Sequence, residues 1–206
     1  MARSKRITAL ANLTKGYQTV VDIGSDHGLV LKEAIDLGYV RFGIASDINE
    51  KPLKQAEKNL KGYPVKLIQS DGFLLLNEPF DLAIIAGMGV HTISAILNNA
   101  PKEEVVYLLQ ANDKIEVLRQ YLVDNEFKII DEHVVYDKFY YVILKVIRGN
   151  MSLDEKDIWL GPILKKKDES KPYYQFRLKQ IKAILLKVKG EMKKRWEKIA
   201  DFHEFL

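Results

Sequence analysis

Short runs of β-branched and apolar residues alternate with helical patterns through most of this 206-residue chain, and that alternation constrains the fold more than any other feature. It is typical of βαβ units and a mostly parallel sheet. The pattern predicts strands and helices in alternation, the strands over 19–24, 40–47, 65–69, 80–87 and 105–110 and the helices near 28–37, 51–61, 90–98 and 113–124. The expected fold class is therefore an open α/β sheet.

Two further strands, over 127–136 and 139–147, complete this pattern, with only Asp137 and Lys138 between them. Two residues leave no room for a crossover helix, so these strands must form an antiparallel hairpin. Five strands with crossovers followed by a hairpin resemble the Rossmann-like seven-stranded sheet of class I methyltransferases. Architecture alone does not settle function.

The sheet pattern ends near Gly149, which predicts a domain over 1–150 with a basic N-terminal helix, and a helical tail over 151–206. Ser152 and Glu155 have the spacing of a capping box that opens a helix. Beyond Pro172, apolar residues follow steps of three and four in a coiled-coil-like stripe: Tyr174, Leu178, Ile181, Leu185, Val188, Met192, Ile199, Phe202 and Leu206.

Gly190 interrupts that stripe, and the sequence leaves two arrangements open. It could end one helix of an antiparallel hairpin, or lie inside a single long helix. A stripe of this kind is usually core or a dimer seam, so we expect a monomer or a weak dimer.

The composition is that of a soluble globular protein, with 47% hydrophobic and 29% charged residues. The absence of cysteine excludes disulfides, thiolate metal sites and cysteine nucleophiles, and the four histidines show no metal-ligand spacing. We therefore expect no metal. No secretory signal and no apolar run approaching the ~20 residues of a membrane span are recognisable, which favours a cytoplasmic location.

The charges are unevenly distributed along the chain. Residues 1–16 carry four basic and no acidic residues, residues 151–206 carry 14 basic and 9 acidic ones, and residues 17–150 carry 14 basic and 19 acidic ones. Basic ends around an acidic body suggest a polyanionic partner held at the periphery. The alternative, that the lysines are merely solvated helix faces, is about equally consistent with the composition.

The first predicted strand runs directly into the turn GSDHG at 24–28. A dinucleotide-binding turn reads GxGxxG, yet here Asp26 stands where the second glycine belongs, and Asp22 adds a second carboxylate. Two like charges a few ångströms apart repel by roughly 1–4 kcal/mol in partly exposed sites, so a pyrophosphate is disfavoured. S-adenosylmethionine has no phosphate and carries a sulfonium and an ammonium group, and it suits an acidic glycine turn.

Acidic or small residues also follow the next strands. Asp47, beside Ile48, could bond both ribose hydroxyls of the cofactor, and Asp71 could bond the adenine amino group while Gly72 lets the backbone approach. The small residues of IAGMG at 85–89 would leave space above the sheet. A lone aspartate at a strand end is more often a helix cap. Together, however, these residues share the carboxyl edge where ligands of open α/β sheets bind.

These stretches together resemble the bacterial tRNA (adenine-22) N(1)-methyltransferase family over nearly the whole chain. DIGSDH at 22–27 and IAGMG at 85–89 are the most specific pieces, supported by LLQAN at 108–112 and WLGPIL at 159–164. The resemblance implies a class I methyltransferase domain with a coiled-coil tail, S-adenosylmethionine as methyl donor, and a target adenine in the D-arm of tRNA.

Transferred position by position, the resemblance implies a donor site at Asp22, Gly24, Asp26, His27, Asp47, Asp71 and Gly72, with Gly87, Met88 and Gly89 lining the reaction chamber. Asn112 matches and is a candidate for holding the target base. Two positions depart from the family pattern, Val90 where a glycine is expected and Ala111 where a proline is expected. The loop near the acceptor is therefore expected to differ in shape from the family pattern.

His27 could act as a general base, but a histidine that caps the helix and bonds the cofactor is at least as consistent, because methylation at adenine N(1) requires no base.

Phosphate contacts are expected from basic residues at both ends of the chain: Arg3, Lys5, Arg6, Lys15, Lys165, Lys166, Lys167, Lys179, Lys182, Lys187, Lys193 and Lys194. Three rival functions remain: a small-molecule methyltransferase, an NAD-dependent oxidoreductase, and a binding module without catalysis.

Overall fold

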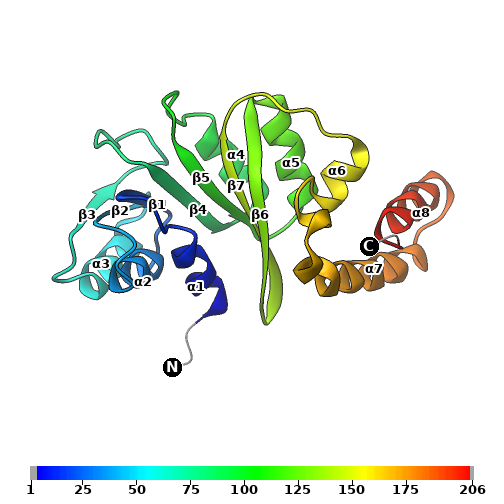
Figure 1. The fold of residues 1–206 in the computed structure, drawn as a ribbon, viewed down its shortest axis with the longest axis horizontal. Coiled ribbons are helices and arrows are strands. Elements are labelled where there is room, and N and C mark those ends of the chain that lie inside the picture. The colour runs from blue at the N-terminus through cyan, green and yellow to red at the C-terminus, as the bar shows by residue number, and fades with distance from the viewer. Residues whose placement is uncertain (1–3, 205–206) are drawn as a thin grey trace.

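The structure, a computed structural model that describes residues 4–204, contains one seven-stranded sheet (Figure 1). Its strand order is β3-β2-β1-β4-β5-β7-β6. Pairing is parallel from β3 to β5, and β7 runs antiparallel to both β5 and β6. The strands are β1 Thr19–Ile23, β2 Phe42–Asp47, β3 Val65–Gln69, β4 Leu82–Met88, β5 Val106–Ala111, β6 Phe127–Asp137 and β7 Phe139–Arg148. The predicted fold class and the terminal hairpin are confirmed.

Helices cover both faces of this sheet because each strand alternates apolar side chains between them. On one face, α1 Lys5–Asn12, α2 Leu29–Asp36 and α3 Glu50–Asn59 pack in one core cluster with Val20, Leu82 and Ile84. On the other face, α4 Val90–Leu97, α5 Ile115–Asp124 and α6 Glu155–Leu160 pack in a second cluster. The elements predicted over residues 19–147 agree with these bounds to within two residues.

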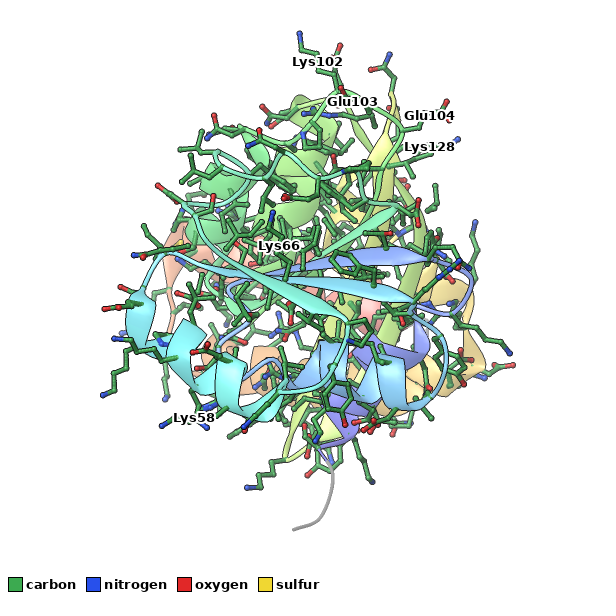
Figure 2. All side chains as sticks on the ribbon, turned by 90° about the vertical axis from the view of Figure 1, so that its left-hand side faces the viewer. Lys58, Lys66, Lys102, Glu103, Glu104 and Lys128 are labelled. Atoms are coloured by element: carbon green, nitrogen blue, oxygen red, sulfur yellow. The ribbon has the colours of Figure 1, made fainter. Side chains whose placement is uncertain are left out.

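The two edges of the sheet differ. The edge at β3 is open, and Lys58 on α3 and Lys66 on β3 lie at this side of the molecule (Figure 2). Lys66 on β3 pairs with Glu78, and its hydrogen bond lowers the pKa of that carboxyl. Charged side chains of this kind protect an edge strand from pairing with another chain. The β6 edge is covered instead by the segment that leads into the tail.

The tail is an antiparallel helical hairpin at the end of the molecule remote from β3 (Figure 1). Two short 3₁₀ turns, η1 Leu164–Lys166 and η2 Asp168–Ser170, lead into α7 Lys171–Leu185, and α8 Gly190–Glu204 folds back on α7. Gly190, with φ +59°, begins α8, so the hairpin alternative is the correct one.

The apolar stripe is only partly buried by this hairpin. Ile181 and Ile199 are buried against each other, whereas Met192, near the hairpin turn, is 52% exposed. Met192 is therefore not part of the core that the hairpin encloses, and a place in a dimer seam stays a prediction. Leu206 lies outside the described residues.

The predicted capping box is also wrong. The N-cap of α6 is Asp154, whose carboxylate accepts a hydrogen bond from the amide of Asp157 at 2.6 Å. Aspartate caps a helix as well as serine does, so the helix begins at Glu155, and Ser152 lies before it.

A buried ion pair joins this segment to the sheet. The side chains of Arg119 on α5 and Glu132 on β6 are both fully buried and lie 2.9 Å apart. Arg119 also donates to the carbonyls of Ile158 and Trp159, and the second oxygen of Glu132 accepts from the amides of Ile163 and Leu164, both at 2.8 Å. Leu160, Leu164 and Tyr174 belong to the main core cluster. The start of the tail therefore shares its core with the sheet, and the boundary at residue 150 stays a prediction.

Over residues 4–204, no helix combines the length and the apolar character that a membrane crossing requires.

Candidate active site

The turn after β1 fixes the first part of the site. Gly24 and Asp26 have φ of +70° and +49°, and Gly28, with φ +69°, is the N-cap of α2. The amides of Gly24 and Ser25 both donate to the carbonyl of Ser46 on β2, at 2.7 and 3.0 Å. A Cβ at Gly24 would lie 1.9 Å from the terminal methyl of Met88, which would have to move, and the positive φ would strain any other residue here. The turn is thus held against the ends of β2 and β4.

Asp22 is the most perturbed acidic group at this edge. It is only 5% exposed, and burial raises its pKa to about 7. The positive charge of Arg6 opposes that shift, while Asp47 and Asp26 add to it. A carboxylate buried near two others is stabilised by any cation placed beside it. The electrostatics of the β1 end therefore favour a positively charged ligand group.

The predicted ribose and adenine contacts lie along the neighbouring strand ends. Asp47 closes β2, and one of its oxygens accepts from the amide of Asn49 at 2.9 Å. Ile48 is 56% exposed beside it, and the Asp71 side chain is exposed after β3. Gly72 has φ +56°, and a Cβ there would lie 3.2 Å from Ile96. Both carboxylates and the exposed isoleucine thus lie on one rim of the sheet, and their cofactor roles stay predictions.

The ends of β4 and β5 are connected through Asn112. A register shift between Ala86 and Met88 leaves Gly87, with φ +80°, as an irregularity in β4. The amide side chain of Asn112 donates to the Gly87 carbonyl at 2.7 Å and accepts from Gln110 at 3.1 Å. Its orientation is therefore fixed although the residue is exposed.

Gly89 lies at the same junction as the N-cap of α4, and Asp113 accepts from the next amide, that of Val90, at 3.3 Å. Met88, one residue earlier, packs over Gly24 as described above. The structure thus brings Met88, Gly89 and Asn112 together at the ends of β4 and β5, next to the turn after β1.

Arg6 lies against the end of β5 and the β6–β7 hairpin. Its guanidinium donates to Gln110 at 2.9 Å and lies over the Tyr141 ring at 5.4 Å. Helix α1 is anchored here because the hydroxyl of Ser4 donates to Asp137 at 2.6 Å, a bond that lowers the pKa of that carboxyl. Arg6 is consequently part of the site interior and lines the cavity described below, and its predicted contact with an RNA phosphate stays a prediction.

His27 and His203 lie in different environments. His27 is exposed, with its side chain 3.5 Å from Asp26, and Gly28 is the N-cap of α2, so the interpretation of His27 as a helix cap is wrong. His203, which sequence analysis did not single out, is buried, and burial lowers its pKa while Nδ1 lies 2.8 Å from the Ile199 carbonyl. Among residues 4–204, no group of three or more histidine, cysteine or acidic residues could hold a metal ion.

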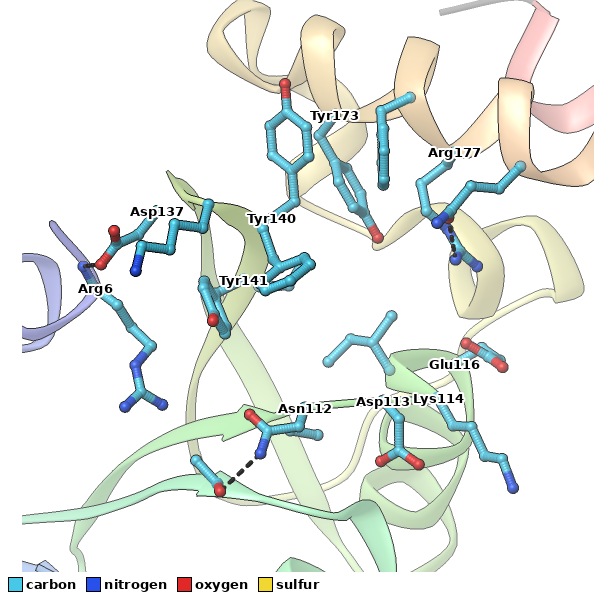
Figure 3. A pocket seen from close by; sticks show the side chains of 18 of the residues that line it. Arg6, Asn112, Asp113, Lys114, Glu116, Asp137, Tyr140, Tyr141, Tyr173 and Arg177 are labelled. Carbon is cyan, nitrogen blue, oxygen red and sulfur yellow. Dashed lines mark hydrogen bonds between the residues drawn. The ribbon is translucent and has the colours of Figure 1, made fainter. Parts of the chain in front are cut away.

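A cavity of about 920 Å³ opens next to Asn112, between α1, the β6–β7 hairpin and α7 (Figure 3). Its aromatic lining consists of Phe139, Tyr140, Tyr141, Tyr173 and Phe176, and its basic lining of Arg6, Lys114, Lys138 and Arg177. Sequence analysis missed this aromatic lining. The run FYY directly after the two-residue turn was the available signal, but it was counted only as a strand.

The remaining basic candidates vary in how free they are. Lys165 pairs with Asp157 and Lys167 with Asp131, both partly buried, which gives these two lysines structural partners. Lys182 and Lys193 form exposed pairs with Glu204 and Glu197. Lys194 likewise forms an exposed pair with Glu191. Lys5, Lys15, Lys166, Lys179 and Lys187 are exposed, and Arg3 lies outside the described residues. Phosphate binding by this set stays a prediction.

Comparison with known proteins gives consistent results. The sequence model of the family described as tRNA (adenine(22)-N(1))-methyltransferase matches residues 20–206. A candidate tRNA methyltransferase of Mycoplasma pneumoniae is 35% identical over 173 residues, covering 78% of this chain and 80% of that protein.

Two solved structures resemble the whole chain. The crystal structure of a Streptococcus pneumoniae protein in complex with S-adenosyl-L-methionine has a TM-score of 0.86 and 25% identity, covering 98% of each chain. A protein of the NADB-Rossmann superfamily from Streptococcus agalactiae has a TM-score of 0.86 and 28% identity, covering 99% of this chain and 96% of that one.

Proposed function

This chain belongs to the tRNA (adenine(22)-N(1))-methyltransferase family, and we propose that it transfers a methyl group from S-adenosylmethionine to N(1) of adenine 22 in the D-arm of tRNA. The observation that carries the proposal is the charge at the β1 end. A buried carboxyl with a pKa raised to about 7, next to a turn built on left-handed residues, suits a phosphate-free, cationic donor better than a dinucleotide.

The residues at the sheet edge fit this donor. Gly24 carries no side chain that would hinder the approach of the donor to the end of β1, and Asp22 would pair with the ammonium group. Asp47 has one oxygen bonded to Asn49 and a second oxygen for a ribose hydroxyl. Asp71 and Ile48 would contact the adenine, the first by hydrogen bonding and the second by apolar packing.

The acceptor adenine would enter from the side of Asn112 and Met88. When bound, S-adenosylmethionine supplies an electrophilic methyl group that the neutral adenine N(1) accepts directly, without prior loss of a proton. The protein then has only to position the adenine against the methyl group. Asn112 suits this role because two hydrogen bonds fix its side-chain amide. His27 is then not required as a base, and its exposed position next to Asp26 agrees with a contact to the donor.

N(1) lies on the Watson-Crick edge, so the adenine must be unpaired or flipped when it reacts. We expect the exposed lysines of α7 and α8 to hold the tRNA backbone. The hairpin buries its own residues Ile181 and Ile199, which supports a monomer or at most a weak dimer. A tRNA-modifying enzyme of this kind is expected to work in the cytoplasm.

The test is incubation of an unmodified tRNA transcript with purified protein and donor labelled in the methyl group, followed by mapping of the modified nucleotide. The expected product is 1-methyladenosine at position 22, and a transcript with guanine at that position should remain unlabelled. Label at another nucleotide, or transfer to small molecules without RNA, would refute the assignment. Binding of NAD in place of the donor would restore the oxidoreductase alternative.

A further inference from the structure

The cavity between α1, the β6–β7 hairpin and α7 is larger than one flipped base requires. At about 920 Å³ it lies near the upper end of the range for pockets that hold drug-sized ligands, roughly 300–1,000 Å³. Asn112 and Gly87, at the acceptor side, line only its inner part, and the outer part extends to α7 (Figure 3). The outer part therefore has room for a second group.

We infer that the outer part of this cavity binds an unpaired nucleotide adjacent to the target adenine, with its base stacked on Tyr140 and Phe176 and its phosphate near Lys138 and Arg177. The inference rests on the proposed function for the identity of the RNA. It adds a second subsite, on the β6–β7 hairpin and α7, to the methyl-transfer site.

Exposed aromatic rings are the first observation that supports this subsite. The Tyr140 ring lies 5.3 Å from that of Phe176 and 4.9 Å from that of Tyr136. Phe139, Tyr136 and Phe176 are 67%, 55% and 40% exposed, although large aromatic side chains gain most from burial. The cluster of Tyr136, Tyr140 and Phe176 is an exposed aromatic patch of the type that marks a binding surface, and aromatic faces are what unpaired bases stack on.

The strand register supplies the second observation. Leu109 on β5 pairs with Leu144 on β7, and the two strands run antiparallel. The first residues of β7, 139–141, must therefore lie past Leu109 at the carboxyl end of β5, which is where Asn112 begins the acceptor region. The aromatic run is thereby placed at the same edge of the sheet as Asn112, and both line one cavity.

The charges around the cavity are the third observation. Four basic side chains line it, with Lys138 at the exposed hairpin turn and Arg177 bonded to Gln180 at 3.0 Å on α7. Three carboxylates line it as well, Asp113, Glu116 and Asp137. Asp137 accepts from Ser4 and from the Arg6 amide, and Asp113 accepts from the Val90 amide, so two of them already interact with donors of the protein. A base with one phosphate matches aromatic walls beside lysine and arginine.

The experiment compares the double variant Y140L/F176L with the wild-type protein in tRNA binding, measured by fluorescence anisotropy. Loss of two stacking rings should weaken binding roughly 10-fold to 100-fold, since base stacking contributes about 1–3 kcal/mol per base. Y140F keeps the ring and should stay within about twofold of the wild type. F42L removes a ring of similar exposure, 36%, at the amino end of β2 and should change nothing.

A second readout locates the nucleotide. Two tRNAs are compared, one with 2-aminopurine at position 21 and one with it at position 23. The fluorescence of one of them should fall on binding to the wild-type protein. With Y140L/F176L the fluorescence of both should stay unchanged. Donor affinity of the variant, measured alongside, should match the wild type because neither ring belongs to the turn after β1. Its melting temperature should fall because Tyr140 packs on Tyr173, and it must stay above the assay temperature for the comparison to hold.

Two results would overturn the inference: unchanged tRNA affinity of the double variant with its fold intact, or undiminished 2-aminopurine fluorescence at both positions. Its failure is distinguishable from failure of the proposed function. If the wild type methylates adenine 22 while the double variant binds normally, only the stacking subsite is wrong. If the rings are needed for binding but no methyl transfer occurs, the proposed reaction is wrong and the RNA subsite stands.

Discussion

Two buried carboxylates, Glu132 at the joint with the tail and Asp22 at the donor edge, differ in what surrounds them. Glu132 accepts hydrogen bonds from Arg119 and from the amides of Ile163 and Leu164. Asp22 is faced by Arg6 and by two other carboxylates, and burial raises its pKa to about 7. The first carboxylate is satisfied within the protein and stabilises the fold. The second is energetically unfavourable until a cation arrives, which is the property expected of a binding group.

The largest loss of stability is expected at the Arg119–Glu132 ion pair, where the tail joins the sheet. Glu132→Ala leaves the guanidinium of Arg119 buried without its counter-ion and two amides without an acceptor, which should lower the free energy of unfolding by about 3–5 kcal/mol. Urea denaturation measures it. As a control, Glu155→Ala breaks an exposed pair with Lys198 and should cost about 0–1 kcal/mol. Equal losses in the two variants would contradict the structural role of the buried pair.

Asp22→Asn should have the opposite profile, with stability retained and ligand binding lost. Removing one charge-assisted contact of about 1.5–3 kcal/mol should weaken S-adenosylmethionine binding roughly 10-fold to 150-fold in calorimetry. Asp201→Asn, on an exposed surface of α8, is the control. Unaltered donor affinity in the Asp22 variant would show that the ammonium group binds elsewhere.

The pH dependence of stability distinguishes the two carboxylates further. The Asp22 carboxyl has a pKa of about 7 when folded and 3.8 in the reference state, so between these values the folded protein holds a proton that the unfolded chain releases. Raising the pH therefore favours unfolding, by up to about 2 kcal/mol between pH 5.5 and 7 without donor. Asp22→Asn should flatten this part of the profile. A steeper profile in the variant would mean that the sign is wrong.

The smallest effects are expected at the tail surface, where charges are solvated. Lys179→Ala and Lys187→Ala should each weaken tRNA binding only about twofold to threefold at physiological salt, and each should lower the slope of log affinity against log salt by about 1. Lys58→Ala, on α3 at the opposite end of the molecule (Figure 2), should change neither quantity. A salt slope unaffected by the tail variants would exclude these lysines from the RNA interface.

Much of the fold could be predicted because its signals are local. Strands such as β3, Val65–Gln69, show up as β-branched runs, and the two residues between β6 and β7 leave only an antiparallel hairpin. The joint at Arg119 and Glu132 could not be predicted, because each residue read alone is an ordinary charged residue on a helix or strand. Their pairing depends on packing between segments 13 and about 40 positions apart.

The candidate site shows the same limit. Asp22, Gly24 and Asp47 lie at strand ends and could be found from spacing, whereas the contact of Arg6 with Gln110 could not, because nothing in the sequence places α1 against β5. The carbonyls and hydroxyls that fix such side chains, as Gln110 does for Arg6, come from distant strands. The aromatic cavity was missed for the same reason: its two walls, the hairpin and α7, meet only in three dimensions.

Gly161, in the middle of WLGPIL, has φ +93°, and a Cβ there would lie 2.6 Å from both Arg119 and Glu132. Packing around the buried Arg119–Glu132 ion pair, and not contact with RNA, thus explains the glycine in the most recognisable motif of the tail. Anyone wishing to exchange the helical hairpin for another recognition module should keep the chain through Ser170 and begin the graft at α7. A junction placed at the apparent end of the sheet, near residue 150, would remove the segment that covers the ion pair.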